Sequence, residues 1–170
     1  MEKGLAETAS VRGSAFFDMH VMLGFCHGKV TQCVARMALA EDLVKSVKGY
    51  ACSSDGGFLC NTADKLGLPV CQALLAYGKE KYDEVLCLLL PLRYSLAGIG
   101  GSWAQRQVLT FTMIHAALKA KQLKLAMALV SELKALKPKS RSVLLLYREI
   151  AKAGSESGQF SLNDHEMQQI

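Results

Sequence analysis

The apolar residues of this chain recur at steps of three and four along most of its length, which constrains its fold more than any other feature. In the stretch AKQLKLAMALVSELKALKP, the spaced apolar residues before Pro138 are Leu123, Ala126, Val130 and Leu133. Such spacing places apolar side chains on one face of a helix. Similar stripes recur along the chain, and no alternating strand pattern competes with them. The sequence therefore predicts an all-α fold of about seven helices.

Seven segments carry the helical pattern, and turn-forming residues separate them. The segments are 15–27, 33–47, 68–77, 85–96, 103–119, 123–133 and 140–152. Pro91 falls inside the fourth segment, so we expect a kink or a break there. Residues 49–64 hold Gly, Ser, Asn and Asp without a helical period, which predicts an inserted loop.

We expect one helical-repeat domain over residues 14–153. Residues 1–13 are polar and predict a flexible N-terminal arm, and residues 154–170 predict a disordered tail. The 170 residues, of which 51% are apolar, suffice for one compact core. The longest apolar run, 85–92, is too short to cross a bilayer, so no membrane-spanning role is expected.

Charge and cysteine usage argue against several functional classes. The net charge of +5 is mild, and the densest basic stretch, 134–141, lacks the interleaved aromatics typical of a nucleic-acid surface. The six cysteines form no C-x-x-C pair, so neither a zinc ribbon nor a thioredoxin-type site is predicted. Because free thiols are usual in reducing compartments, we expect a cytoplasmic protein. We also expect no cofactor and no metal.

Two stretches share the offsets of a helical hairpin repeat. Ala126 is followed by apolar residues four and seven positions on and by a proline twelve positions on. Val85 has apolar residues at the same first two offsets, with the small residue Ala73 twelve positions before it. Small residues let antiparallel helices approach closely. These offsets are those of the tetratricopeptide repeat, at irregular spacing between units, so we expect degenerate hairpins forming a piece of a right-handed α-solenoid.

The stretch GLPVCQALLAYGKEKYDEVLCLLLPLRYSLAGIGGSWAQRQVLTFTMIHAALK, residues 67–119, resembles the C-terminal part of the tetratricopeptide repeat protein 38 family. FFDMHVMLGF at 16–25 and ELKALKP at 132–138 extend the resemblance to roughly residues 14–150. The resemblance implies a cytosolic helical-repeat protein and carries over no catalytic residue. Family members are longer, so the chain is expected to be a C-terminal fragment or a shortened form.

The segment LLLPLRYSLAGIGGSWAQR, residues 88–106, joins two predicted helices through a glycine-rich turn. A phosphate-binding loop of this kind would follow a strand and carry a lysine, whereas here a helix precedes the turn and no lysine follows. Ser102 and Gln105 have the spacing of a capping box. We therefore interpret the segment as a capped corner between helices.

The residues beside this corner form the predicted partner-binding site. They are Arg93, Tyr94, Gln105 and Arg106. Arginine can bind a carboxylate through two hydrogen bonds, as a peptide tail on a helical array would require. The alternative is that these arginines form structural pairs with carboxylates of the preceding hairpin, namely Glu80, Asp83 or Glu84. The leading function is a non-catalytic scaffold for protein–protein interaction, with a protein or peptide partner of unknown identity.

The first predicted helix carries more apolar surface than a helix exposed to water tolerates. Its candidate self-association residues are Phe16, Phe17, Met19 and Leu23. If these side chains lack a partner within the chain, they favour a homodimer or cover by the N-terminal arm.

The competing function is a small enzyme or ligand-binding protein that uses a Cys/His pocket. Its candidate residues are His20, Cys26, His27 and His115. A nucleophilic cysteine requires a base close to it in space, and a metal site requires further ligands with suitable spacing. Structural histidines in the core or at an interface are the interpretation that we favour.

Overall fold

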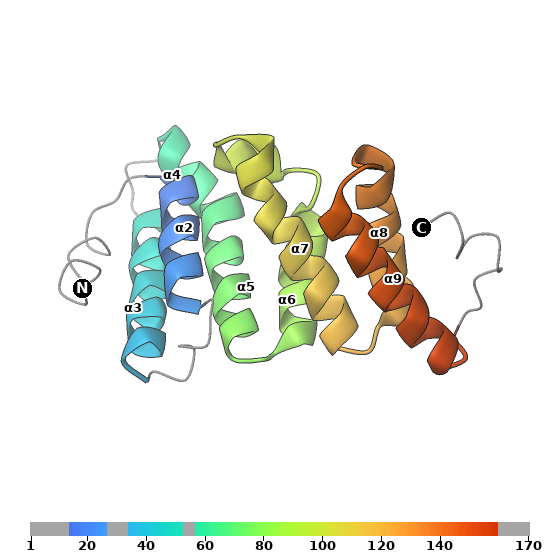
Figure 1. The fold of residues 1–170 in the computed structure, drawn as a ribbon. Helices are drawn as coiled ribbons and strands as arrows, with labels where there is room; N and C mark the ends of the chain where they lie inside the picture. Colours follow the sequence, from blue (N-terminus) through green and yellow to red (C-terminus); the bar gives the residue numbers. More distant parts are fainter. Residues whose placement is uncertain (1–13, 27–33, 53–56, 160–170) are drawn as a thin grey trace. The chain divides into compact units, whose positions relative to one another are not determined.

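The computed structural model describes residues 14–26, 34–52 and 57–159. Every regular element in these ranges is a helix, which confirms the all-α prediction (Figure 1). Within them, the α-helices of eight residues or more are α2 (Ala15–Cys26), α3 (Val34–Ala51), α5 (Leu68–Gly78), α6 (Tyr82–Leu89), α7 (Trp103–Lys119), α8 (Leu123–Leu136) and α9 (Arg141–Glu156). The shorter elements are the helix α4 (Phe58–Thr62), the π-helical segment η1 (Ala63–Gly67) and the 3-10 turns η2 (Leu90–Leu92) and η3 (Leu96–Ile99).

The chain divides into two compact units, residues 1–109 and 110–170, with the boundary inside α7. In the first unit, α2 packs against both α3 and α5, and α5 forms an antiparallel hairpin with α6 (Figure 1). Met19, Met22 and Phe25 of α2 are almost completely buried. Neighbours on two sides therefore explain why α2 is apolar nearly all round.

Two glycines bring α2 and α5 close together at both ends of α5. A Cβ atom at Gly67 would lie 3.0 Å from the Cβ of Ala15, and one at Gly78 would lie 3.3 Å from the Cβ of Cys26. Such separations are tighter than ordinary van der Waals contact, so a side chain at either position would push the two helices apart.

The prediction of a loop at residues 49–64 is wrong for most of the residues that the structure describes there, which are 49–52 and 57–64. α3 continues to Ala51, and α4 passes directly into η1 and α5, with right-handed helical backbone at Thr62 and Ala63. The side chains of Cys60 and Ala63 are buried. Burial of these small apolar groups thus stabilises helix in a stretch whose polar composition favours turns.

Pro91 ends α6, as expected. The α-helix stops at Leu89 and the chain tightens into η2, because proline has no N–H to donate and its ring crowds the preceding turn. The following turn η3 buries Leu96 and Ile99. The chain then reaches two glycines with positive φ, 98° at residue 100 and 70° at residue 101, before α7 begins.

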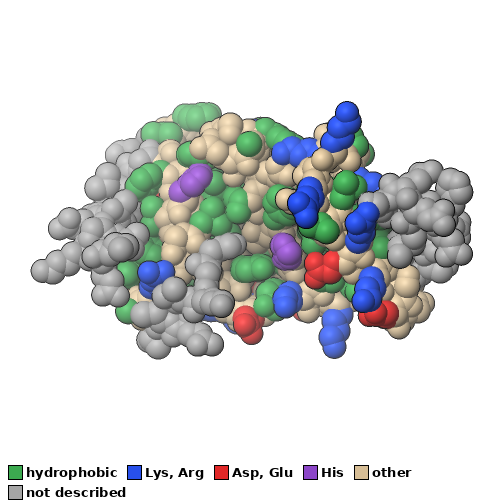
Figure 2. Space-filling model, in the orientation of Figure 1, with side chains coloured by type: hydrophobic (Ala, Val, Ile, Leu, Met, Phe, Trp, Pro, Cys, Tyr) green, Lys and Arg blue, Asp and Glu red, His purple; other side chains and the backbone are tan. Residues whose placement is uncertain are grey.

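The second unit contains the end of α7 and the antiparallel hairpin α8–α9. The buried faces of this hairpin include Ala126, Val130 and Leu133 of α8 and Val143, Leu146 and Ile150 of α9. Full burial of Ala126 agrees with its predicted place at the crossing of the two helices. On the face drawn in Figure 2, Lys and Arg side chains are frequent over α8 and α9.

The predicted terminal segments are described only in part. α9 continues to Glu156, so residues 154–156 of the expected tail are helical instead, because the buried Gly154 extends the apolar face of the helix. The N-terminal arm at 1–13 and residues 160–170 of the tail lie outside the described ranges.

Candidate functional site

The α6–α7 corner, residues 90–106, contains all four predicted partner-binding residues and lies in the first unit. Consecutive turn bonds hold its backbone: Gly98 N–H donates to the Ser95 carbonyl at 2.9 Å, and Gly100 N–H donates to the Ala97 carbonyl at 3.2 Å. Because Leu96 is buried below these turns, the residues at both ends of the corner are displayed from an anchored segment.

The predicted capping box is present at the start of α7. The Ser102 N–H donates to Oε1 of Gln105 at 2.8 Å, and the Gln105 N–H donates to Oγ of Ser102 at 3.3 Å. These two bonds satisfy donors that an uncapped helix would leave open. The interpretation of this segment as a capped corner is confirmed, and Gln105 has a structural role in it.

Arg106 binds the backbone of the same corner. Its Nη1 donates to the Gly100 carbonyl at 2.9 Å and also to the Gly101 carbonyl. Hydrogen bonds from a charged donor are stronger than neutral ones, so the guanidinium stabilises the two glycine peptides. Arg106 thus donates to carbonyl oxygens of the corner, whereas the alternative drawn from the sequence paired it with carboxylates of the preceding hairpin.

Arg93 and Tyr94 lie at the other end of the corner and contact each other. The guanidinium carbon of Arg93 lies 4.4 Å from the centre of the Tyr94 ring, and Nη2 donates to the phenolic oxygen. The Tyr94 side chain is nevertheless 77% exposed. The stack fixes an aromatic ring and a cation together at the surface.

Trp103 is the residue that sequence reasoning missed. It is the first residue of α7 and the only tryptophan of the chain, and it is 47% exposed. Its place directly after the capping residue Ser102 was the available signal, because the first turn of a helix lies beside the connecting segment. The corner thus displays an aromatic side chain at each end.

The two glycines of the corner receive a side chain from α2. A Cβ atom at Gly101 would overlap the ring of Phe16, so the phenylalanine ring occupies the space that any side chain there would need. The Phe16 ring also lies 4.3 Å from the ring of His20, whose Nδ1 is 2.8 Å from the Phe16 carbonyl oxygen. Glycine is required here by the neighbouring ring as well as by its positive φ.

This packing corrects the predicted self-association surface. Met19 is completely buried, so it cannot contact a second copy of the chain, and the ring of Phe16 is engaged with Gly101 inside the first unit. The reason is that α2 has neighbours within its own chain, α3 and α5, which the sequence did not reveal. Phe17 and Leu23 are half-buried, and a homodimer through them stays a prediction.

The candidate nucleophile Cys26 is buried at the α2–α5 contact. Burial raises the pKa of its thiol to about 11, an effect only partly offset by the charge of Lys79. A reactive cysteine needs the opposite shift, because the thiolate is the nucleophile. His20 is exposed and engaged with Phe16, His115 lies on α7 in the second unit, and His27 lies outside the described residues.

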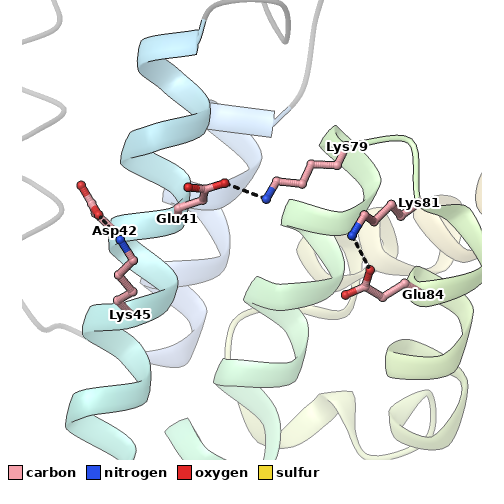
Figure 3. A network of polar contacts seen from close by, with 6 residues as sticks. All are labelled: Glu41, Asp42, Lys45, Lys79, Lys81 and Glu84. Carbon is pink, nitrogen blue, oxygen red and sulfur yellow. Dashed lines mark hydrogen bonds and ion pairs between the residues drawn. The ribbon is translucent and has the colours of Figure 1, made fainter.

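The ion pairs of the first unit drawn in Figure 3 lie at the surface, and one of them, between Lys79 and Glu41, links two helices. Lys79 after α5 donates to Glu41 of α3 at 2.7 Å, and this hydrogen bond and charge lower the pKa of the Glu41 carboxyl. Lys81 lies 3.6 Å from Glu84 at the start of α6. In this hairpin, Glu84 is thus paired with a lysine of its own turn.

Comparisons with known proteins leave the chain without an assigned family: no family model matches it, and no solved structure matches it. In the described ranges, no group of three or more His, Cys, Asp or Glu side chains has an arrangement that could hold a metal ion. None of the helices there combines the length and the apolar character needed to cross a bilayer.

Proposed function

We propose that this chain is a non-catalytic helical-repeat scaffold that binds a protein partner at the α6–α7 corner. The observation that carries the proposal is the exposure of Tyr94 and Trp103, at 77% and 47%, with Arg93 stacked on the first of them. Tyrosine, tryptophan and arginine are the residue types most enriched among the few residues that dominate binding energy in protein interfaces. Such a group on one short segment is more than the scattered exposed apolar residues of an ordinary surface.

Different residues of the corner hold its backbone and are exposed at its surface, and this difference supports the proposal. Gln105 and Arg106 bind the corner's own backbone, and Phe16 packs against it from α2. A binding surface whose supporting groups are held in place loses less conformational entropy when a partner docks. Arg93 and Tyr94 are then the contact residues, whereas Gln105 and Arg106 hold the shape of the corner.

The proposal includes the family and the repeat type. We infer that α5–α6 and α8–α9 are degenerate tetratricopeptide units of a right-handed α-solenoid, and that the chain is a C-terminal portion related to the tetratricopeptide repeat protein 38 family. Burial of Ala73, Val85 and Ala126 at the repeat offsets supports this inference. The buried thiols of Cys26 and Cys71 act as small apolar groups, a usage compatible with the cytoplasmic location that we propose.

The test is affinity capture from a cytosolic extract, with quantitative mass spectrometry of the bound proteins. We expect Tyr94→Ser/Trp103→Ser to reduce recovery of specific partners about tenfold or more, because each aromatic contributes at the scale of an interface hot spot. Arg93→Ala should reduce recovery less. The matched control is Phe58→Ser/Leu59→Ser, which removes another exposed apolar pair, 79% and 51% exposed, from α4.

Thermal unfolding and circular dichroism are measured for both double variants, and recovery is compared only at a temperature at which each variant is fully folded. Undiminished recovery of every partner by the Tyr94/Trp103 variant, or an equal loss in the α4 control, would remove the corner as the binding site.

A further inference from the structure

The chain between Glu132 and Glu149 is entirely free of carboxylates. Its basic residues are Lys134, Lys137, Lys139, Arg141 and Arg148. They belong to the end of α8, the connecting turn and the first half of α9, all in the second unit. Elsewhere, on α3 and in the α5–α6 hairpin, lysines pair with nearby acids (Figure 3). Among the described residues, Lys139 and Arg141 of this turn have no such ion pair.

Two exposed leucines accompany this charge. Leu136 is 69% exposed and Leu145 is 52% exposed. The Lys134 ammonium lies 4.1 Å from the centre of the Tyr147 ring, so these two positions face each other across the antiparallel hairpin. Leu136 is the last residue of α8 and Leu145 lies in the first turns of α9, so both leucines lie close to the turn that carries Lys139 and Arg141. We call this surface the hairpin tip and define it by Leu136, Lys139, Arg141 and Leu145.

The hairpin tip exposes side chains that can form both ion pairs and apolar contacts with a partner. Lys139 and Arg141 are exposed, and within the part of the chain that the structure describes, no ion pair engages either of them. Exposed leucines gain free energy when another apolar surface covers them. Cations attract an acidic partner during the encounter, and the pairs strengthen when nearby apolar contacts exclude water.

We propose that the hairpin tip binds an acidic segment of a partner protein, with carboxylates on Lys139 and Arg141 and apolar side chains over Leu136 and Leu145. This surface shares no residue with the α6–α7 corner. The inference therefore goes beyond the proposed function and stands on separate side chains.

The composition of the surface favours a peptide over a nucleic acid or a lipid surface. Single-stranded nucleic acids stack their bases on exposed aromatic rings, whereas the ring of Tyr147 beside the tip is covered by Lys134. A helix lying in a lipid interface needs a continuous apolar face. The exposed side of α9 carries Arg148, Glu149 and Lys152 beyond Leu145, and the carboxylate of Glu149 would repel anionic lipid.

The test is a fluorescence-anisotropy titration of the full chain with a short labelled peptide of glutamates that carries two leucines. Lys139→Glu/Arg141→Glu should weaken binding about tenfold or more, since two attractions become repulsions. Leu136→Gln/Leu145→Gln should weaken it about threefold to tenfold while leaving its salt dependence unchanged. The matched control Lys48→Glu/Lys65→Glu makes the same charge change at exposed positions of the first unit and should leave binding within about twofold of the parent chain.

Two parallel titrations use a single-stranded oligonucleotide and phosphatidylserine vesicles. The proposal predicts that neither binds more tightly than the peptide and that the tip variants keep the parent's circular dichroism spectrum. It is overturned if the peptide fails to bind, if the control variant loses as much affinity as the tip variant, or if the oligonucleotide or the vesicles bind more tightly through Lys139 and Arg141.

Discussion

The α6–α7 corner and the α8–α9 hairpin tip are both turns between helices, but they use their polar groups in opposite ways. In the corner, Ser102 and Gln105 cap each other's N–H groups and Arg106 binds two carbonyls. At the tip, Ser140 precedes α9 without a side-chain capping bond, and Arg141 has no ion pair among the described residues. The polar side chains of the corner thus form hydrogen bonds that stabilise the corner itself, whereas Lys139 and Arg141 at the tip remain exposed and can contact another molecule.

The largest expected effect follows Gly101→Ala in the corner. Alanine at φ 70° is strained, and its methyl group would overlap the Phe16 ring. We expect the free energy of unfolding to fall by about 3 kcal/mol, the sum of the backbone strain and the overpacking. Chemical denaturation monitored by circular dichroism measures this change.

Gly158→Ala provides the matched control, because its φ is 66° but a Cβ there meets no atom of the described residues within 4 Å. Only the backbone strain applies, so the loss should be about 1 kcal/mol. Equal losses at the two glycines would show that Phe16 does not pack against the corner as described.

Replacing one arginine in each turn tests whether only the corner depends on its cation for stability. Arg106→Ala removes the donor from the carbonyls of Gly100 and Gly101, and we expect the free energy of unfolding to fall by about 1–2 kcal/mol. Arg141→Ala at the tip should change stability by less than about 0.5 kcal/mol, as is usual for an exposed side chain. Thermal unfolding of the two variants side by side tests this difference. A larger loss for Arg141 would mean that the tip, too, is held by its own cations.

The smallest expected difference in stability is that between alanine variants of the two serines that precede helices. Ser102→Ala should lower stability by about 1 kcal/mol, because the N–H of Gln105 loses its acceptor. Ser140→Ala should lower it by a few tenths of a kcal/mol at most, since that side chain makes no capping bond. Urea midpoints resolve the two values, and a reversed order would contradict the contrast between the turns.

The periodic parts of the fold were predictable from sequence because local rules decide them. The apolar stripes located α7 and α8, Pro91 marked the end of α6, and the spacing of Ser102 and Gln105 identified their reciprocal cap. Each of these features depends on residues within a few positions of one another, so distant parts of the chain do not change the outcome.

Most of the features that sequence reasoning missed depend on how the chain packs, and one depends on backbone directions within the corner itself. The helical path through Cys60 and Ala63 requires a buried environment that outweighs the local turn signals. Phe16 was assigned to self-association because nothing in its own segment indicates Gly101 as its neighbour. The acceptors of Arg106 are carbonyls whose directions follow from the positive φ values of two glycines. Tertiary packing fixes the first two of these features, and the backbone geometry of two glycines fixes the third, so apolar periodicity encodes none of them.

The π-helical turn η1 has a consequence for the face that α4 presents. A wide turn inserted between two α-helical stretches shifts the phase of one relative to the other, and one residue corresponds to about 100° of rotation. Deleting a single residue from 63–67 would turn α4 about its axis by roughly that angle. Cys60, now buried, would rotate out of the core while the exposed Phe58 changed direction, so the length of this segment sets which side chains of α4 face water.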